Sequence, residues 1–227
     1  MKKESFSRIL NSLMILSILI FTSSCKKDKT PASITDIEGN VYKIVTIGTQ
    51  TWMAENLKTT KLTDGTSITV VTDNTPWLNS ASASICYPYN DNGNKAIYGV
   101  LYNWFAVNTG KLCPDGWHVA TDADWTTLVT YAGGTDIAGG KLKETGTSHW
   151  NDPNTGAADE FGFKALPGGM RYNSGTFSNT GSLCVWWSST EDGNLNAWSC
   201  SIVSGASLAN RYSFAKQYGL SVRCVKN

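Results

Sequence analysis

The sequence predicts an α+β domain made mostly of antiparallel strands and loops, with two or three short helices in its first half. Helical periodicity occurs only before residue 145, whereas hairpin signals follow one another after residue 160. Helices and strands that are segregated along a chain, and do not alternate, are typical of α+β folds. The 21 glycines and nine tryptophans indicate a loop-rich domain with a strongly aromatic core.

The first 25 residues have the layout of an export signal. Basic residues precede an apolar run at 13–21, which is shorter than the about 20 residues that a membrane span needs, and three hydroxyl residues stand before Cys25. This pattern resembles the lipobox of bacterial lipoproteins, which implies a signal peptide over 1–24 and a lipid on Cys25. An ordinary cleaved signal and an uncleaved anchor are the alternatives. We expect 25–36 to be a lipidated tether and 37–227 to be one domain.

The charge of the chain argues against a nucleic-acid partner. The formal net charge is +1 and no basic stripe is present, so we expect no nucleic-acid partner. The expected contacts are the membrane, through the lipid, and a polysaccharide or a surface protein. We expect an exported protein at the outer membrane, with the periplasmic and the surface face both open, and no cofactor.

The elements of the first half begin with a hairpin over 41–53 that turns at Gly48. The clearest helix spans 121–131, because four apolar residues from Trp125 to Ala132 fall on one helical face. Thr121 or Asp122 caps this helix, and glycines 133 and 134 end it. Further predicted elements are a strand at 68–71 and short helices at 98–107 and 138–144.

The second half is expected to consist of strands. The segment 170–177 predicts a hairpin that turns at Asn173-Ser174. Two aromatic strands, 185–188 and 197–202, flank a turn near residue 192, and 220–225 closes the chain as a strand.

Five separated motifs resemble the Fibrobacter succinogenes major paralogous domain over about residues 37–226. One departure is Ala120, where that family usually has proline. The resemblance implies an exported protein, often a lipoprotein, of Bacteroidetes or Fibrobacteres, and it implies no reaction. The motifs are Gly48-x-Gln50-x-Trp52-Met53, Cys113-Pro-Asp-Gly-Trp-His-Val-Ala-Thr121, Leu166-Pro-Gly-Gly169, Trp186-Trp-Ser-Ser-Thr-Glu191 and Ser221-Val-Arg-Cys-Val225.

More distantly, the Cys-Pro-x-Gly-Trp segment and the closing Val-Arg-Cys strand resemble C-type lectin-like domains and the formylglycine-generating-enzyme-like variant of that fold. In those domains the cysteine near the first helix pairs with the cysteine of the last strand. The resemblance therefore implies a Cys113–Cys224 disulfide. It does not carry over the copper chemistry of the formylglycine enzymes, because Cys184 and Cys200 lack the spacing of that motif.

A second disulfide, Cys184–Cys200, is expected from strand register. If Trp187 faces Ala197 across the turn near residue 192, Cys184 faces Cys200, and facing Cβ atoms lie about 4.5–5.5 Å apart, near disulfide reach. A different register would break this pairing. Cys86 would then be the odd thiol, buried as a small apolar residue.

Aromatic residues in loops are the candidate ligand-binding groups. Tyr172, Phe177, Trp150 and Tyr212 lie outside the strongly patterned elements, so we expect them on a surface that contacts a glycan or a protein. Most other tryptophans are expected in the core. No residues form a convincing catalytic set, so a binding or display module is the favoured interpretation and no enzyme is expected.

Two alternatives depend on carboxylates. Asp152, Asp159 and Glu160, with Asn154, are weak candidates for a calcium site, because calcium prefers oxygen ligands, but they also suit a simple polar loop. A glycan-acting enzyme would need two carboxylates across a cleft, for which Asp159, Glu160 and Glu191 are available. A purely structural envelope module is the third possibility.

Overall fold

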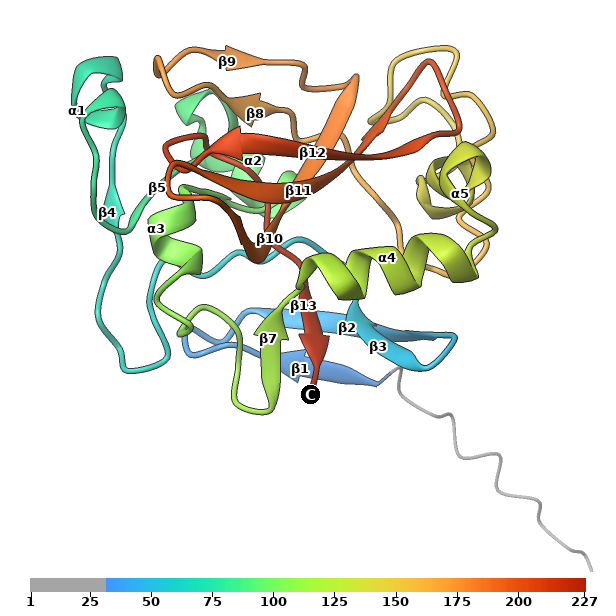
Figure 1. Cartoon of the computed structure of the whole chain (residues 1–227), viewed down its shortest axis with the longest axis horizontal. Helices are drawn as coiled ribbons and strands as arrows, with labels where there is room; N and C mark the ends of the chain where they lie inside the picture. Colours follow the sequence, from blue (N-terminus) through green and yellow to red (C-terminus); the bar gives the residue numbers. More distant parts are fainter. Residues whose placement is uncertain (1–31) are drawn as a thin grey trace, which may run out of the picture. The chain divides into compact units, whose positions relative to one another are not determined.

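The computed structural model describes residues 32–227, which form one domain of mixed α+β class with mostly antiparallel strands (Figure 1). The expected signal peptide, Cys25 and most of the tether lie outside the described residues. Among residues 32–227, no helix is long and apolar enough to cross a membrane.

The largest sheet joins the beginning of the domain to its end. Its strand order is β1-β2-β3-β13-β7, and every pairing is antiparallel. Figure 1 shows the blue β2–β3 hairpin beside the red final strand. The strands are β1 (Ser33–Thr35), β2 (Val41–Ile47), β3 (Gln50–Met53), β13 (Cys224–Lys226) and β7 (Trp117–Val119). The predicted hairpin over 41–53 is thereby confirmed, and Gly48 turns it with a φ of 60°.

The second sheet lies at the centre of the domain. It contains β10 (Leu183–Asp192), β11 (Asn196–Val203) and β12 (Ala209–Ala215) in that order, so β12 is an edge strand. Trp186 and Trp187 follow one another in β10 and belong to two different core clusters. Because successive side chains of a strand point to opposite faces, this sheet contributes to the core on both sides.

Two small sheets complete the strands. One contains β4 (Thr69–Val70), β5 (Ser84–Cys86) and β6 (Leu101–Tyr102), and the other is the predicted hairpin of β8 (Met170–Arg171) and β9 (Phe177–Ser178).

Within residues 32–227, all helices precede residue 143, as expected, but five α-helices are present instead of two or three. The predicted helix 121–131 is α4 (Asp122–Tyr131), whose capping box joins Thr121 and Asp124. The predicted helix 98–107 is wrong in detail: strand β6 occupies 101–102, and the helix that follows it covers only 104–107. The others are α1 (Asn74–Leu78), α2 (Asn92–Tyr98), α3 (Trp104–Val107) and α5 (Thr135–Leu142), with a 3₁₀ turn at Pro88–Asn90.

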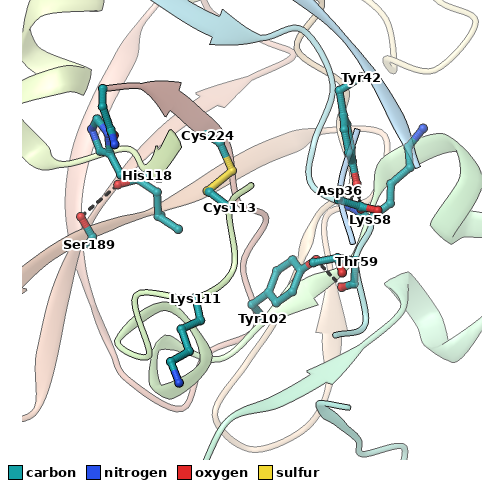
Figure 2. The surroundings of a disulfide bond; sticks show 12 residues. Asp36, Tyr42, Lys58, Thr59, Tyr102, Lys111, Cys113, His118, Ser189 and Cys224 are labelled. Atoms are coloured by element: carbon teal, nitrogen blue, oxygen red, sulfur yellow. Dashed lines mark hydrogen bonds between the residues drawn. A yellow bond between two sulfur atoms is a disulfide. The ribbon is translucent and has the colours of Figure 1, made fainter. Parts of the chain in front are cut away.

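A disulfide joins Cys113 to Cys224, as the lectin-like resemblance implied (Figure 2). It ties the loop before β7 to the final strand, across 111 residues of sequence. Closing so long a loop restricts the unfolded chain and stabilises the fold by about 2–5 kcal/mol in the chain-entropy account.

The expected Cys184–Cys200 disulfide is wrong, since both cysteines are free and buried. Cys184 faces Ile202, and Cys200 faces Trp186. Beside the turn, Asp192 pairs with Asn196, so the hairpin turns at 193–195 and not near residue 192. Between Trp187 and Glu191, β10 has three residues where β11 has one, and this irregularity restores only half of the offset from the expected register. The two cysteines are therefore diagonal neighbours. Such residues lie about 7–8 Å apart, and a disulfide needs Cβ atoms within about 4.5 Å of each other.

Three buried cations hold loops together through backbone carbonyls. Within residues 32–227, Arg171, Arg223 and Lys143 donate hydrogen bonds to carbonyl or amide oxygens and to no carboxylate. Each cation also faces an aromatic ring: Arg223 lies 4.3 Å from the Phe163 centroid, and Lys143 lies 5.4 Å from that of Trp150. Burial lowers the pKa of Lys143 to about 8 and that of Arg223 to about 10.

Candidate functional site

Four aromatic side chains form a continuous row at the edge of the central sheet, here called the aromatic ladder. Tyr212 and Phe214 lie two residues apart on β12 and so share one face of the strand. Tyr218 follows β12, and Tyr172 follows β8. Successive ring centroids are 6.3 Å apart from Tyr212 to Phe214, 5.0 Å from Phe214 to Tyr218, and 5.8 Å from Tyr218 to Tyr172.

The ladder has one side on the core and one side in solvent. Tyr172, Phe214 and Tyr218 are half-buried and pack against the larger core cluster. Tyr212 is half-exposed, with 50% of its surface accessible. The half-buried rings are thereby held in place, whereas the exposed parts and the tyrosine hydroxyls remain available for a ligand.

The opposite face of β12 fixes the strand against α4. Arg211 lies 3.2 Å from the centroid of the Trp198 ring and forms a two-point ion pair with Asp122, at 2.6 and 3.0 Å. A cavity of about 210 Å³ beside this pair is lined by Trp125 and Cys200. These contacts hold the edge strand, and with it the ladder, in one position.

The structure brings two of the four predicted aromatic residues together. Tyr172 and Tyr212 belong to the ladder, but Phe177 does not. Phe177 stacks on Tyr89 with a centroid distance of 5.6 Å and covers the Arg171 guanidinium at 4.9 Å. Its ring therefore supports the β8–β9 hairpin.

The surface position expected for Trp150 is wrong, because only 1% of this side chain is exposed. Its indole Nε1 donates to the Ala165 carbonyl at 2.9 Å, and its ring faces the Lys143 ammonium. Loop composition suggested exposure, but the loop folds over the indole and satisfies its polar atom.

Sequence analysis missed Phe214 and Tyr218. The alternation in Tyr212-Ser213-Phe214 was a usable signal for a strand with both rings on one face. No local signal connects Tyr218 to Tyr172, because residues 46 apart in the chain meet only after the sheets have packed.

The candidate calcium ligands are spread over separate interactions. Asp159 Oδ1 accepts from the Lys164 amide at 2.8 Å, Glu160 pairs with Lys141 at 3.2 Å, and Asp152 is exposed. The side-chain amide Nδ2 of Asn154 donates hydrogen bonds to the carbonyls of Glu144 and Gly146. In residues 32–227, no three His, Cys, Asp or Glu side chains are grouped so that they could hold a metal ion.

The free thiols are poor nucleophiles. Burial raises the pKa of Cys86 and of Cys200 to about 12, and it raises the pKa of Cys184 well above its ordinary value. A thiol must lose its proton to attack, so these three cysteines stay protonated near neutral pH.

The two histidines pair with carboxylates. His118 Nε2 lies 3.0 Å from Asp124 Oδ2 at the start of α4, and His149 Nδ1 lies 2.6 Å from Glu144 Oε2. Glu191 lies 2.9 Å from the Lys216 ammonium. Each of these groups has a structural partner in the folded domain.

Comparison with known proteins gives one assignment. The family model described as the Fibrobacter succinogenes major domain matches residues 45–226. No curated protein and no solved structure matches the chain, so the more distant lectin-like resemblance stays a prediction. Because the matched segment covers most of the sequence and includes both disulfide cysteines and the whole aromatic ladder, the chain belongs to the Fibrobacter succinogenes major domain family.

Proposed function

We propose that this protein is an exported, lipid-anchored envelope protein whose domain binds polysaccharide on the aromatic ladder. The observation that carries the proposal is the unbroken row of four partly or largely exposed rings from Tyr212 to Tyr172. The proposed lipid on Cys25 would attach the domain to the membrane.

The chemistry of the ladder suits a carbohydrate. Sugar rings carry apolar C–H groups on their faces and hydroxyls around their edges. Aromatic rings offer a flat apolar surface to the former, and the hydroxyls of Tyr172, Tyr212 and Tyr218 can exchange hydrogen bonds with the latter. Rings that are already packed lose little conformational freedom when a ligand binds, so weak contacts can add up along a chain of sugars.

A glycan-acting enzyme receives less support. The carboxylates considered for such a reaction, Asp159, Glu160 and Glu191, each interact with a lysine side chain or backbone amide. None of them lies in the aromatic ladder. The ladder therefore supports recognition of a sugar chain without cleavage.

Affinity electrophoresis of the full-length chain in gels containing plant and bacterial polysaccharides tests the proposal. We expect at least one polysaccharide to retard the protein, and the Tyr212→Ala/Phe214→Ala variant to lose about tenfold in affinity, because two stacking surfaces disappear. Tyr131→Ala is the matched control: Tyr131 is an exposed tyrosine that packs on one other ring, Phe161, at 5.7 Å.

Each outcome has a defined meaning. Loss of retardation in the ladder variant, but not in Tyr131→Ala, supports the proposal. Equal retardation of all three proteins, or no retardation by any polysaccharide, rejects it. Retardation that requires calcium and disappears with a chelator would also reject it, in favour of a metal-dependent lectin.

A further inference from the structure

A second cavity, distinct from the aromatic ladder, has a volume of about 420 Å³. It lies between the β2–β3 hairpin, α2 and the loop at 159–166, and it shares no lining residue with the ladder. Small-molecule sites commonly have volumes of about 300–1,000 Å³, so this space suits a small ligand. Its charged lining residues are Lys43, Lys58, Lys164, Arg223, Glu55 and Asp159.

Positive charge exceeds negative charge on this lining. Within the described part of the chain, Lys43 and Lys58 form no ion pair, whereas Lys164 pairs with Glu144 at 3.3 Å. Arg223 is buried and lines the cavity, and none of its four hydrogen bonds goes to a carboxylate. A buried charge is weakly screened, so it adds to the attraction for an anion.

The two acidic residues constrain the kind of anion. Glu55 accepts a hydrogen bond from the Lys43 amide at 2.8 Å, and Asp159 accepts one from the Lys164 amide at 2.8 Å. Each of them binds the backbone through one oxygen, which leaves the other oxygen as an acceptor for the ligand. The cavity thus offers cationic donors for an anionic group and carboxylate acceptors for hydroxyl groups.

We propose that this cavity binds a hexuronic acid, either free or at the end of an acidic glycan. Its carboxylate would face Lys43 and Lys58, and its hydroxyls would donate to Glu55 and Asp159. A neutral hexose leaves the two ammonium groups without a charged partner. Inorganic phosphate has the charge, but it offers few hydroxyl donors for the two carboxylates to accept from.

Isothermal titration of the full-length chain with D-galacturonate and D-glucuronate tests this proposal, with D-galactose and inorganic phosphate as comparison ligands at equal ionic strength. We expect one uronate to bind at least tenfold more tightly than D-galactose or phosphate. We expect its affinity to fall as salt is added, because the ligand and the lysines are only partly shielded from water.

The variant Lys43→Gln/Lys58→Gln should lose about tenfold in uronate affinity. Lys61→Gln/Lys226→Gln is the matched control, because it removes the same charge from two exposed lysines outside the cavity. Circular dichroism verifies that both variants fold; if the first does not, Lys43→Arg/Lys58→Arg replaces it and should retain uronate binding.

Equal binding of D-galactose, or equal or tighter binding of phosphate, would overturn the proposal. Undetectable uronate binding at millimolar concentration would also overturn it. So would an equal loss of uronate affinity in the two glutamine variants. The result is separable from the polysaccharide test, because the lysine variants leave all four rings of the ladder in place.

Discussion

Arg223 provides the most direct test of how this fold is held together. Its guanidinium donates to Asn56 Oδ1 at 2.8 Å, to the Met53 carbonyl at 2.8 Å, to the Phe163 carbonyl at 2.9 Å and to the Lys164 carbonyl at 3.3 Å. One side chain thus joins the end of β3 to the loop before β8. Replacing Arg223 with Met keeps an unbranched apolar chain there and removes every donor.

The expected cost combines two opposing terms. Losing the bonds to Met53 and Phe163 leaves two buried carbonyls unsatisfied, whereas Asn56 Oδ1 loses one charged donor and keeps the Trp186 indole at 2.8 Å. Each lost bond costs about 2 kcal/mol, or about 6 kcal/mol together. In the other direction, the variant no longer buries a charge. Burial lowers the pKa of Arg223 to about 10, so removing the buried charge stabilises the variant by about 3 kcal/mol. The loss of hydrogen bonds is larger, so Arg223→Met should lower the free energy of unfolding by about 3 kcal/mol.

Urea unfolding followed by tryptophan fluorescence, with the disulfide kept oxidised, measures this loss. Arg211→Met is the control, since Arg211 pairs with Asp122 at the surface and is about half exposed, and such pairs contribute about 0–1 kcal/mol. If Arg223→Met lowers the free energy of unfolding by no more than Arg211→Met does, the hydrogen bonds of the buried guanidinium do not stabilise the fold as argued.

Two further predictions concern cysteine chemistry and pH. Iodoacetamide at pH 8 should leave Cys86, Cys184 and Cys200 unmodified in the folded protein and modify all three in urea, because burial raises each thiol pKa; peptide mapping that finds Cys184 joined to Cys200 would contradict the register observed here. Burial raises the pKa of Asp124, but hydrogen bonds from Thr121 and the contact with His118 outweigh it and leave the pKa lowered. The stability that Asp124 contributes is therefore complete above pH 4 and is lost as the pH falls through its folded-state pKa. Asp124→Asn should cost about 1 kcal/mol at pH 7 and progressively less below pH 4, as urea unfolding at a series of pH values would measure; a cost that does not change with pH would refute this.

The sequence alone was sufficient for elements whose determinants are local. The helix at 121–131 has its cap, its apolar face and its glycine stop within fourteen residues, and the structure places it within one residue of the prediction. The hairpin over 41–53 likewise contains its own turn. The Cys113–Cys224 disulfide could be named in advance only through the family resemblance, since spacing alone leaves cysteine pairing open.

The candidate site required more than local pattern. Tyr172 and Tyr212 were identified as surface aromatics, but the ladder exists only because β8, β12 and the residues after β12 meet at one edge. Trp150 was misplaced because its burial depends on hydrogen bonding to Ala165 and on the Lys143 ammonium, neither of which composition reveals.

The sequence by itself determined the fold class, the family and the principal hairpins. It also determined that the short helices lie in the first part of the chain. Tertiary structure decided that Cys184 and Cys200 stay unpaired, which aromatic rings meet and where the cationic side chains lie. The reason is physical: periodicity and turn residues act over a few positions, whereas the register that places Cys184 opposite Ile202 depends on how β10 and β11 pair within the folded domain.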